Sequence, residues 1–223
     1  MTELATPTIA PPASRTSTLW RVAGGLALAH VVMLFAGFSQ EVVVEHATSL
    51  DTIMQKYGDA DLNRVLTGGY IEAMSFIVLV VAVVLIGRLF GSVTEVAKIA
   101  GQAFVALGIV FAATTLAVGF APGASAVYWS QHDGTAQLVG AINDIRNYGF
   151  VIQVAISLAM AGALACAALS RKIFAVWVGW FGLVLGTLGV AVAALVPNAM
   201  SMAQLIWWVG LAVLCLRGGP KTS

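Results

Sequence analysis

The chain has 223 residues, of which 60% are hydrophobic and only 9% are charged. This composition, with a mean hydropathy of +0.94, excludes an ordinary soluble domain and indicates a protein that lies mostly in lipid. The formal net charge of +1 leaves no basic patch for nucleic-acid phosphates, so no nucleic-acid partner is expected. The two cysteines, Cys166 and Cys215, indicate neither a disulfide framework nor a zinc site.

Residues 1–18 are rich in Pro, Thr, Ser and Ala, a composition that predicts a disordered cytoplasmic tail. Six apolar stretches follow, of roughly the 20 residues that a helix needs to cross a bilayer. They are Leu19–Ser39, Gly69–Phe90, Ile99–Phe120, Tyr148–Leu169, Ile173–Val196 and Met202–Leu216. The blocks of alternating polarity that mark a membrane barrel are absent. We therefore expect an all-α fold, a polytopic membrane bundle of six transmembrane helices in one domain over residues 19–217, with a cytoplasmic tail over 218–223.

The basic residues predict the orientation of the spans, because cytoplasmic loops carry the excess of Lys and Arg. With the N-terminus in the cytoplasm, Lys56, Arg64 and Arg146 face outward and every other Lys and Arg faces inward. The acidic residues of the loops have the opposite bias. We therefore expect a multi-pass protein of the plasma (inner) membrane with both termini in the cytoplasm.

Both long outer connections are expected to form short helices on the membrane surface. Within residues 41–66 the apolar residues follow one helical face, and Ser49 and Gly58 suit the start and the end of a helix. Within residues 121–147 a similar pattern follows Thr135, a suitable N-terminal cap.

Small residues recur along one face of the fourth and fifth spans, and Gly182 and Gly186 form a GxxxG step. In lipid such steps allow helices to approach closely. They are expected to pack within this chain, and the alternative is a homo-oligomer that forms through Gly182 and Gly186.

Two short motifs carry a resemblance to a known family. Arg21-Val22-Ala23-Gly24 opens the first span, and Asn147-Tyr148-Gly149-Phe150 opens the fourth. With six spans and this length, the chain resembles the bacterial family of membrane proteins known as domain of unknown function 4386, over roughly residues 19–217. The resemblance implies a six-span bundle of one domain and no reaction.

Glu72 is the clearest ionisable residue within a predicted span, where a charged group is costly. Counted along the helices, it lies at the depth of Gln153, and Arg146 and Tyr148 lie just above Gln153 in the same span. Arg146 could reach down and pair with Glu72. These four residues form the candidate ligand-binding pocket, open to the outside, and the alternative is a structural clasp between the second and fourth spans.

The other polar residues offer weaker candidates. His30, near the middle of the first span, is expected to be neutral and hydrogen-bonded to a neighbouring helix, because no second histidine at its depth could complete a haem site. The acidic and histidine residues of the outer loops lack the spacing of a metal site. They are Glu41, Glu45, His46, His132, Asp133 and Asp144. No metal and no cofactor is therefore expected.

Three classes of function remain. The absence of an assembled acid, base and nucleophile argues against an intramembrane enzyme, and Pro122 and Pro197 fall at span ends rather than within a broken helix of a transporter. A structural or regulatory membrane component is expected first. Binding or transport of a small molecule or lipid around Glu72 is the alternative.

Overall fold

The computed structural model describes residues 13–45, 47–91, 94–170 and 176–219. Within these ranges the chain is helical and contains no strand. The α-helices are α1 (Ala13–Phe38), α2 (Leu50–Gly58), α3 (Leu62–Gly91), α4 (Glu95–Thr115), α5 (Ala121–Gln131), α6 (Ala136–Leu169), α7 (Val176–Val184), α8 (Val190–Val192) and α9 (Pro197–Leu216). Two π-helical turns, η1 (Leu116–Phe120) and η2 (Leu185–Gly189), join α4 to α5 and α7 to α8 without a break.

Five continuous helices in the described part of the chain are long and apolar enough to cross a membrane. They are Thr16–Phe38, Leu62–Gly91, Glu95–Gln131, Ala136–Leu169 and Pro197–Leu216. The remaining predicted span corresponds to the shorter apolar helix Val176–Val192, and the first residues predicted for it lie outside the described ranges. The protein is therefore an all-α, multi-span membrane protein.

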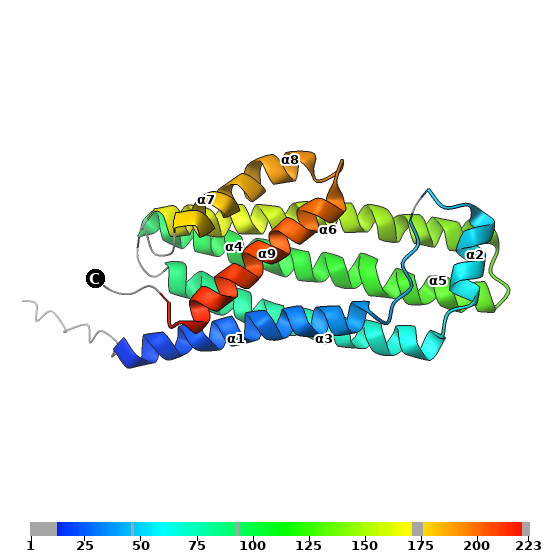
Figure 1. Cartoon of the computed structure of the whole chain (residues 1–223), viewed down its shortest axis with the longest axis horizontal. Helices are drawn as coiled ribbons and strands as arrows, with labels where there is room; N and C mark the ends of the chain where they lie inside the picture. Colours follow the sequence, from blue (N-terminus) through cyan, green and yellow to red (C-terminus); the bar gives the residue numbers. More distant parts are fainter. Residues whose placement is uncertain (1–12, 46, 92–93, 171–175, 220–223) are drawn as a thin grey trace, which may run out of the picture.

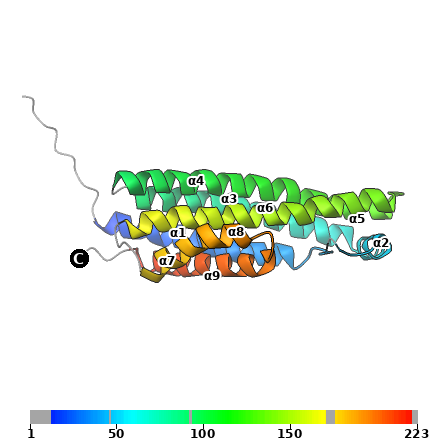
Figure 2. The ribbon, with the colours of Figure 1, turned by 90° about the horizontal axis from the view of Figure 1, so that it is seen from above.

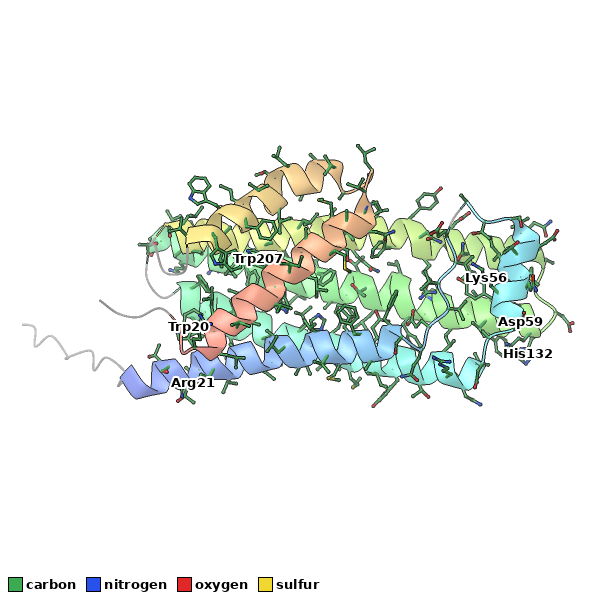
Figure 3. The ribbon with its side chains drawn as sticks, in the orientation of Figure 1. Trp20, Arg21, Lys56, Asp59, His132 and Trp207 are labelled. Atoms are coloured by element: carbon green, nitrogen blue, oxygen red, sulfur yellow. The ribbon has the colours of Figure 1, made fainter. Side chains whose placement is uncertain are left out.

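The long helices form a ring around one interior. Helix α1 packs on α3, α3 on α4, α4 on α6, α6 on α9, and α9 returns to α1, while α7 covers α6 from outside (Figures 1 and 2). The start of α1 and the end of α9 lie at the same end of the bundle, which we call the terminal end (Figure 1). Helix α2 lies across the other end, the capped end, and packs on α5 and α6. Figure 3 shows Arg21 near the terminal end and Lys56, Asp59 and His132 at the capped end.

At the capped end, one of the two predicted short helices is present and the other is not. Ser49 caps α2 by accepting a hydrogen bond from the Thr52 amide, and α2 ends at Gly58 as predicted. Thr135 likewise caps α6, but α6 then runs unbroken into the membrane and no separate surface helix forms. The predicted surface segment is therefore the first part of a long transmembrane helix.

The chain also continues through Pro122, where the sequence predicts the end of a span. Helix Glu95–Gln131 includes Pro122 in the first turn of α5, immediately after the π turn η1. A proline lacks the amide proton of a normal helical turn and its ring crowds the carbonyl four residues earlier. The wider π turn accommodates it, so the helix extends beyond the predicted boundary at Phe120.

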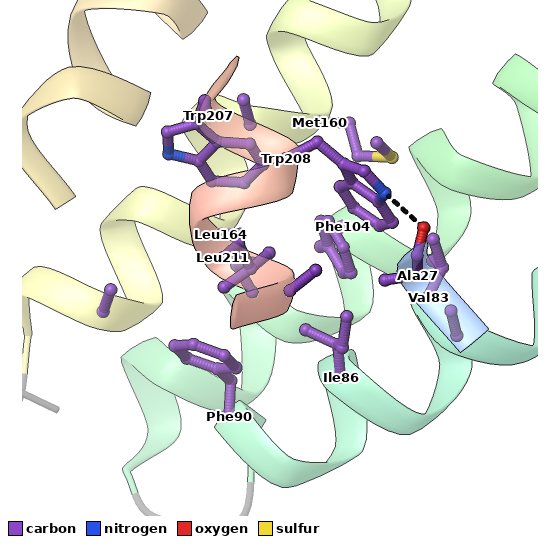
Figure 4. Close-up of a cluster of buried hydrophobic side chains, with 14 of the residues drawn as sticks. Ala27, Val83, Ile86, Phe90, Phe104, Met160, Leu164, Trp207, Trp208 and Leu211 are labelled. Atoms are coloured by element: carbon purple, nitrogen blue, oxygen red, sulfur yellow. Dashed lines mark hydrogen bonds between the residues drawn. The ribbon is translucent and has the colours of Figure 1, made fainter. Parts of the chain in front are cut away.

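Apolar packing fills the half of the ring nearer the terminal end. Trp207, Trp208 and Leu211 of α9 are buried among side chains of α3, α4 and α6 (Figure 4). The Trp208 indole N–H donates to the Ala27 carbonyl at 3.3 Å, which joins α9 to α1. A second, smaller cluster around the buried Tyr57 lies beneath α2. The ring is therefore closed by packing at both ends.

The small-residue faces of α6, α7 and η2 pack within the chain. A Cβ atom at Gly162 would lie 2.8 Å from the Cα of Gly186, and one at Gly182 would lie 2.7 Å from the Trp207 indole nitrogen. Both distances are too short for a side chain. Gly162 and Gly186 therefore allow α6 and η2 to approach each other, and Gly182 allows α7 to approach α9, as the prediction of intramolecular packing requires.

Candidate functional site

A cavity of about 390 Å³ occupies the half of the ring nearer the capped end. Residues of α1, α3, α4, η1, α6 and α9 surround it. Most of its wall is apolar, including Leu34, Phe76, Leu79, Phe111 and Met160. The buried Trp208 forms part of the wall farthest from the capped end. The cavity therefore extends from the polar cap into the hydrophobic part of the bundle.

The end of the cavity nearest α2 is charged. Arg146 of α6 donates to a carboxylate oxygen of Glu41 and to the carbonyl oxygen of Val42, both in the extended segment that follows α1. The Glu41 side chain is only 3% exposed and that of Arg146 14%. Asn147, the next residue of α6, donates to the Val44 carbonyl at 3.0 Å. Helix α6 therefore holds the segment after α1 against the mouth of the cavity.

Close packing of α1 on α3 brings Glu41 beside Glu72. A Cβ atom at Gly37 would lie 2.6 Å from the Gly68 carbonyl oxygen and 2.8 Å from the Glu72 amide nitrogen. Only glycine permits this approach, so the chain leaves α1 next to the turn of α3 that carries Glu72. The carboxyl group of Glu72 interacts with that of Glu41 and, to a lesser extent, with the charge of Arg146.

The structure brings three of the four predicted site residues to one cavity. Glu72, Arg146 and Gln153 all line it. Tyr148 does not line it, and this residue is 61% exposed on the surface of α6. It lies two residues from Arg146, and residues at that spacing point to different sides of a helix.

The predicted ion pair is corrected. Arg146 pairs with Glu41, which the sequence analysis places among the acidic residues of the outer loops, and not with Glu72. The pairing depends on the path of the chain after Phe38, which helical periodicity does not describe. A signal was nevertheless available, because Glu41 lies only a few residues beyond the first span.

Polar residues of α9 add a second group that the sequence analysis missed. Asn198, Ser201 and Gln204 line the cavity from the first two turns of α9. Their spacing of three residues places them along one helical face. The predicted span begins only at Met202, so this polar face was not recognised.

One buried acceptor at the charged end remains unsatisfied. Among the residues that the structure describes, Glu41 Oε1 has no hydrogen-bond partner. A buried polar atom without a partner is costly in a folded protein. It therefore marks a position at which a donor would be stabilised, whether a proton shared with the Glu72 carboxyl or a group from outside the chain.

His30 lies at the deeper part of the cavity wall. Its Nδ1 atom is 3.0 Å from the Ser75 carbonyl oxygen of α3, and because a carbonyl only accepts, Nδ1 carries the proton. This contact confirms the predicted hydrogen bond to a neighbouring helix. His132 lies at the capped end (Figure 3), and its ring stacks on that of Tyr128. His46 lies outside the described residues.

Polar residues of α2 and α6 form a network next to the charged end of the cavity. The buried Tyr57 hydroxyl donates to the Asn143 side-chain oxygen at 2.7 Å, and burial raises the pKa of the Tyr57 phenol, partly opposed by Arg146. Among the described residues no group of three or more His, Cys, Asp or Glu side chains is placed to hold a metal ion.

The chain matches no protein-family model, no curated protein and no solved structure. Membership of the family known as domain of unknown function 4386 therefore stays a prediction, which rests on the residues quoted for it. The functional proposal below therefore rests on the cavity and the residues that line it.

Proposed function

We propose that the protein binds an elongated amphipathic small molecule or lipid within the membrane. The observation that carries this proposal is the cavity, which joins a buried charged end to an apolar body. Such a division suits a ligand with a polar head and a hydrocarbon tail, because each part meets groups of its own polarity.

The dimensions of the cavity support this class of ligand. Its volume of about 390 Å³ falls within the range of roughly 300–1,000 Å³ of small-molecule sites. Arg146 and Met160 both line the cavity and lie on the same helix, α6. At a helical rise of about 1.5 Å per residue, their positions are about 20 Å apart along the helix axis. A compact polar metabolite would leave most of that length without favourable contacts.

An opening toward lipid supports entry from the bilayer. Phe35 and Phe38 of α1 and Met202 of α9 line the cavity, and each is about half exposed. Nearer the terminal end, α1 and α9 are held together by the Trp208 contact with Ala27. Figure 1 shows α9 crossing the bundle obliquely, away from α1 toward the capped end. We therefore place the entrance between these two helices.

The proposal includes six spans, with both termini in the cytoplasm of a cell bounded by its plasma (inner) membrane. The connection between α8 and α9 lies close to the level at which α1 ends (Figure 1), which supports a crossing by Val176–Val192. The terminal end then faces the cytoplasm, in keeping with the distribution of Lys and Arg. The charged end of the cavity lies toward the outside.

Ligand binding accounts for the buried charges in a way that the first-expected class, a structural or regulatory component, does not. A structural clasp needs no cavity beside it, and close packing would stabilise it better. The proposal assigns no chemical reaction to the site and no role to a homo-oligomer.

Native mass spectrometry of the full chain, released from lipid nanodiscs, tests the proposal. The wild type should retain a small molecule or lipid that is enriched relative to the surrounding bilayer. Leu79→Trp, which fills the cavity from α3, should lose it. Val81→Trp, on the exposed face of the same helix, is the matched control and should retain it. Equal retention by the two variants, or no retained molecule in the wild type, would contradict the proposal.

A further inference from the structure

We infer that the charged end of the cavity binds a cationic head group, a protonated amine, of the amphipathic ligand. The inference rests on the proposed function and specifies its ligand. It is carried by the charges around Glu41 and Glu72 and by the unsatisfied oxygen of Glu41.

The cavity mouth has more acidic than basic groups. Glu41 and Glu72 are both buried, and among the described residues Arg146 is the one largely buried cation beside them. Arg64, which donates to the Ser39 carbonyl nearby, is exposed, so water screens its charge. With both carboxylates ionised, the mouth carries one excess negative charge, which one monovalent cation would neutralise.

The hydrogen-bonding groups also favour a donor. Arg146 already donates to Glu41 and to the Val42 carbonyl, so its charge is already paired, and an anionic head would also be repelled by the nearby carboxylates. Among the described residues none donates to Glu41 Oε1, and Gln153, whose amide oxygen can accept, lines the same cavity. An ammonium group has three donors and no acceptor. Its charge and its hydrogen bonds therefore both match this site.

A proton shared by the two carboxyl groups is the competing arrangement. It would also remove the excess charge, and it would leave a neutral site that prefers a hydroxyl head over an ammonium. The two arrangements therefore differ in their selectivity between an amine and an alcohol of equal chain length.

Dodecylamine and dodecan-1-ol are matched probes for this difference. Their tails are identical, and the amine is protonated at pH 7 because its pKa is near that of a lysine, about 10.4. Saturable binding of each radiolabelled probe is measured with the full chain in nanodiscs of zwitterionic lipid, after subtraction of the uptake by empty nanodiscs. We expect the amine to bind at least about tenfold more tightly, because hydrogen bonds to a charged group contribute more than neutral ones.

Two variants test whether Glu72 causes the preference for the amine over the alcohol. Glu72→Gln keeps the size of the side chain and should weaken amine binding by about tenfold while changing alcohol binding by less than about twofold. The comparison of probes on the wild type needs no variant, so a Glu72→Gln protein that fails to fold leaves the test intact. Leu79→Trp should abolish binding of both probes.

The outcomes separate the inference from the proposed function. Equal binding of amine and alcohol, lost in Leu79→Trp, would overturn the cationic head group and leave a ligand-binding cavity. An amine preference that persists unchanged in a folded Glu72→Gln variant would likewise overturn it. Absence of saturable binding of either probe would overturn the proposed function together with the inference.

Discussion

Replacement of Arg146 by methionine should destabilise the protein more than any other single loss of charge. The side chain neutralises the buried Glu41 carboxylate and donates to the Val42 carbonyl. Loss of one partner of a buried ion pair leaves an uncompensated charge and costs about 3–5 kcal/mol. The side chain of Arg146 is 14% exposed and borders a cavity, so we expect the lower part of this range, about 3 kcal/mol. Methionine retains the apolar stem, and the effect therefore reports the lost charge.

The free energy of unfolding can be measured in mixed micelles by titration with a denaturing detergent and followed by tryptophan fluorescence. Arg64→Met is the control, because this exposed arginine makes one hydrogen bond to a carbonyl and should lose less than about 0.5 kcal/mol. The double variant Glu41→Gln/Arg146→Met removes both charges and should recover part of the stability. A loss below about 1 kcal/mol for Arg146→Met, or additive losses in the double variant, would refute the reasoning.

Three further predictions concern packing, the capped end and topology. Gly186→Leu should lower the melting temperature in detergent, because overpacking costs about 1–3 kcal/mol or more. Gly25→Leu should leave it unchanged, because Gly25 is exposed and a Cβ atom added there meets no atom within 4 Å. Tyr57→Phe should lose about 1–3 kcal/mol of unfolding free energy, because a buried acceptor loses its donor; an unchanged stability would place that hydrogen bond in water. In a background without native cysteines, a membrane-impermeant maleimide on intact cells should label a cysteine that replaces Asp133 and not one that replaces Ser14; the opposite pattern would reverse the topology.

The transmembrane helices could be predicted from the sequence because crossing a bilayer demands long apolar runs. Their ends were less predictable. A proline such as Pro122 usually ends a helix. Here the π turn η1 accommodates it, and the helix continues to Gln131. That outcome depends on packing around η1, where the Phe120 ring lies against Gly69 of α3, and no local pattern reveals it.

The candidate site was predicted where helical periodicity alone determines position. Gln153 lies seven residues from Arg146, which returns to the same face of α6 after two turns, and both line the cavity. Tyr148 is only two residues from Arg146, so helical periodicity places it on a different side of α6. Glu41 could not be assigned by periodicity, because its place beside Glu72 depends on an extended segment and on the close approach of α1 to α3.

Photolabelling tests the cavity most directly. Met160 lines the cavity but is 0% exposed, whereas Val32 is exposed on the surface of α1. A twelve-carbon alkylamine that carries a terminal diazirine is activated with the full chain in nanodiscs, and the labelled residues are identified by mass spectrometry. The proposal predicts saturable labelling at Met160 that excess dodecylamine prevents. Labelling confined to lipid-facing residues such as Val32, in proportion to probe concentration, would contradict a ligand-binding cavity.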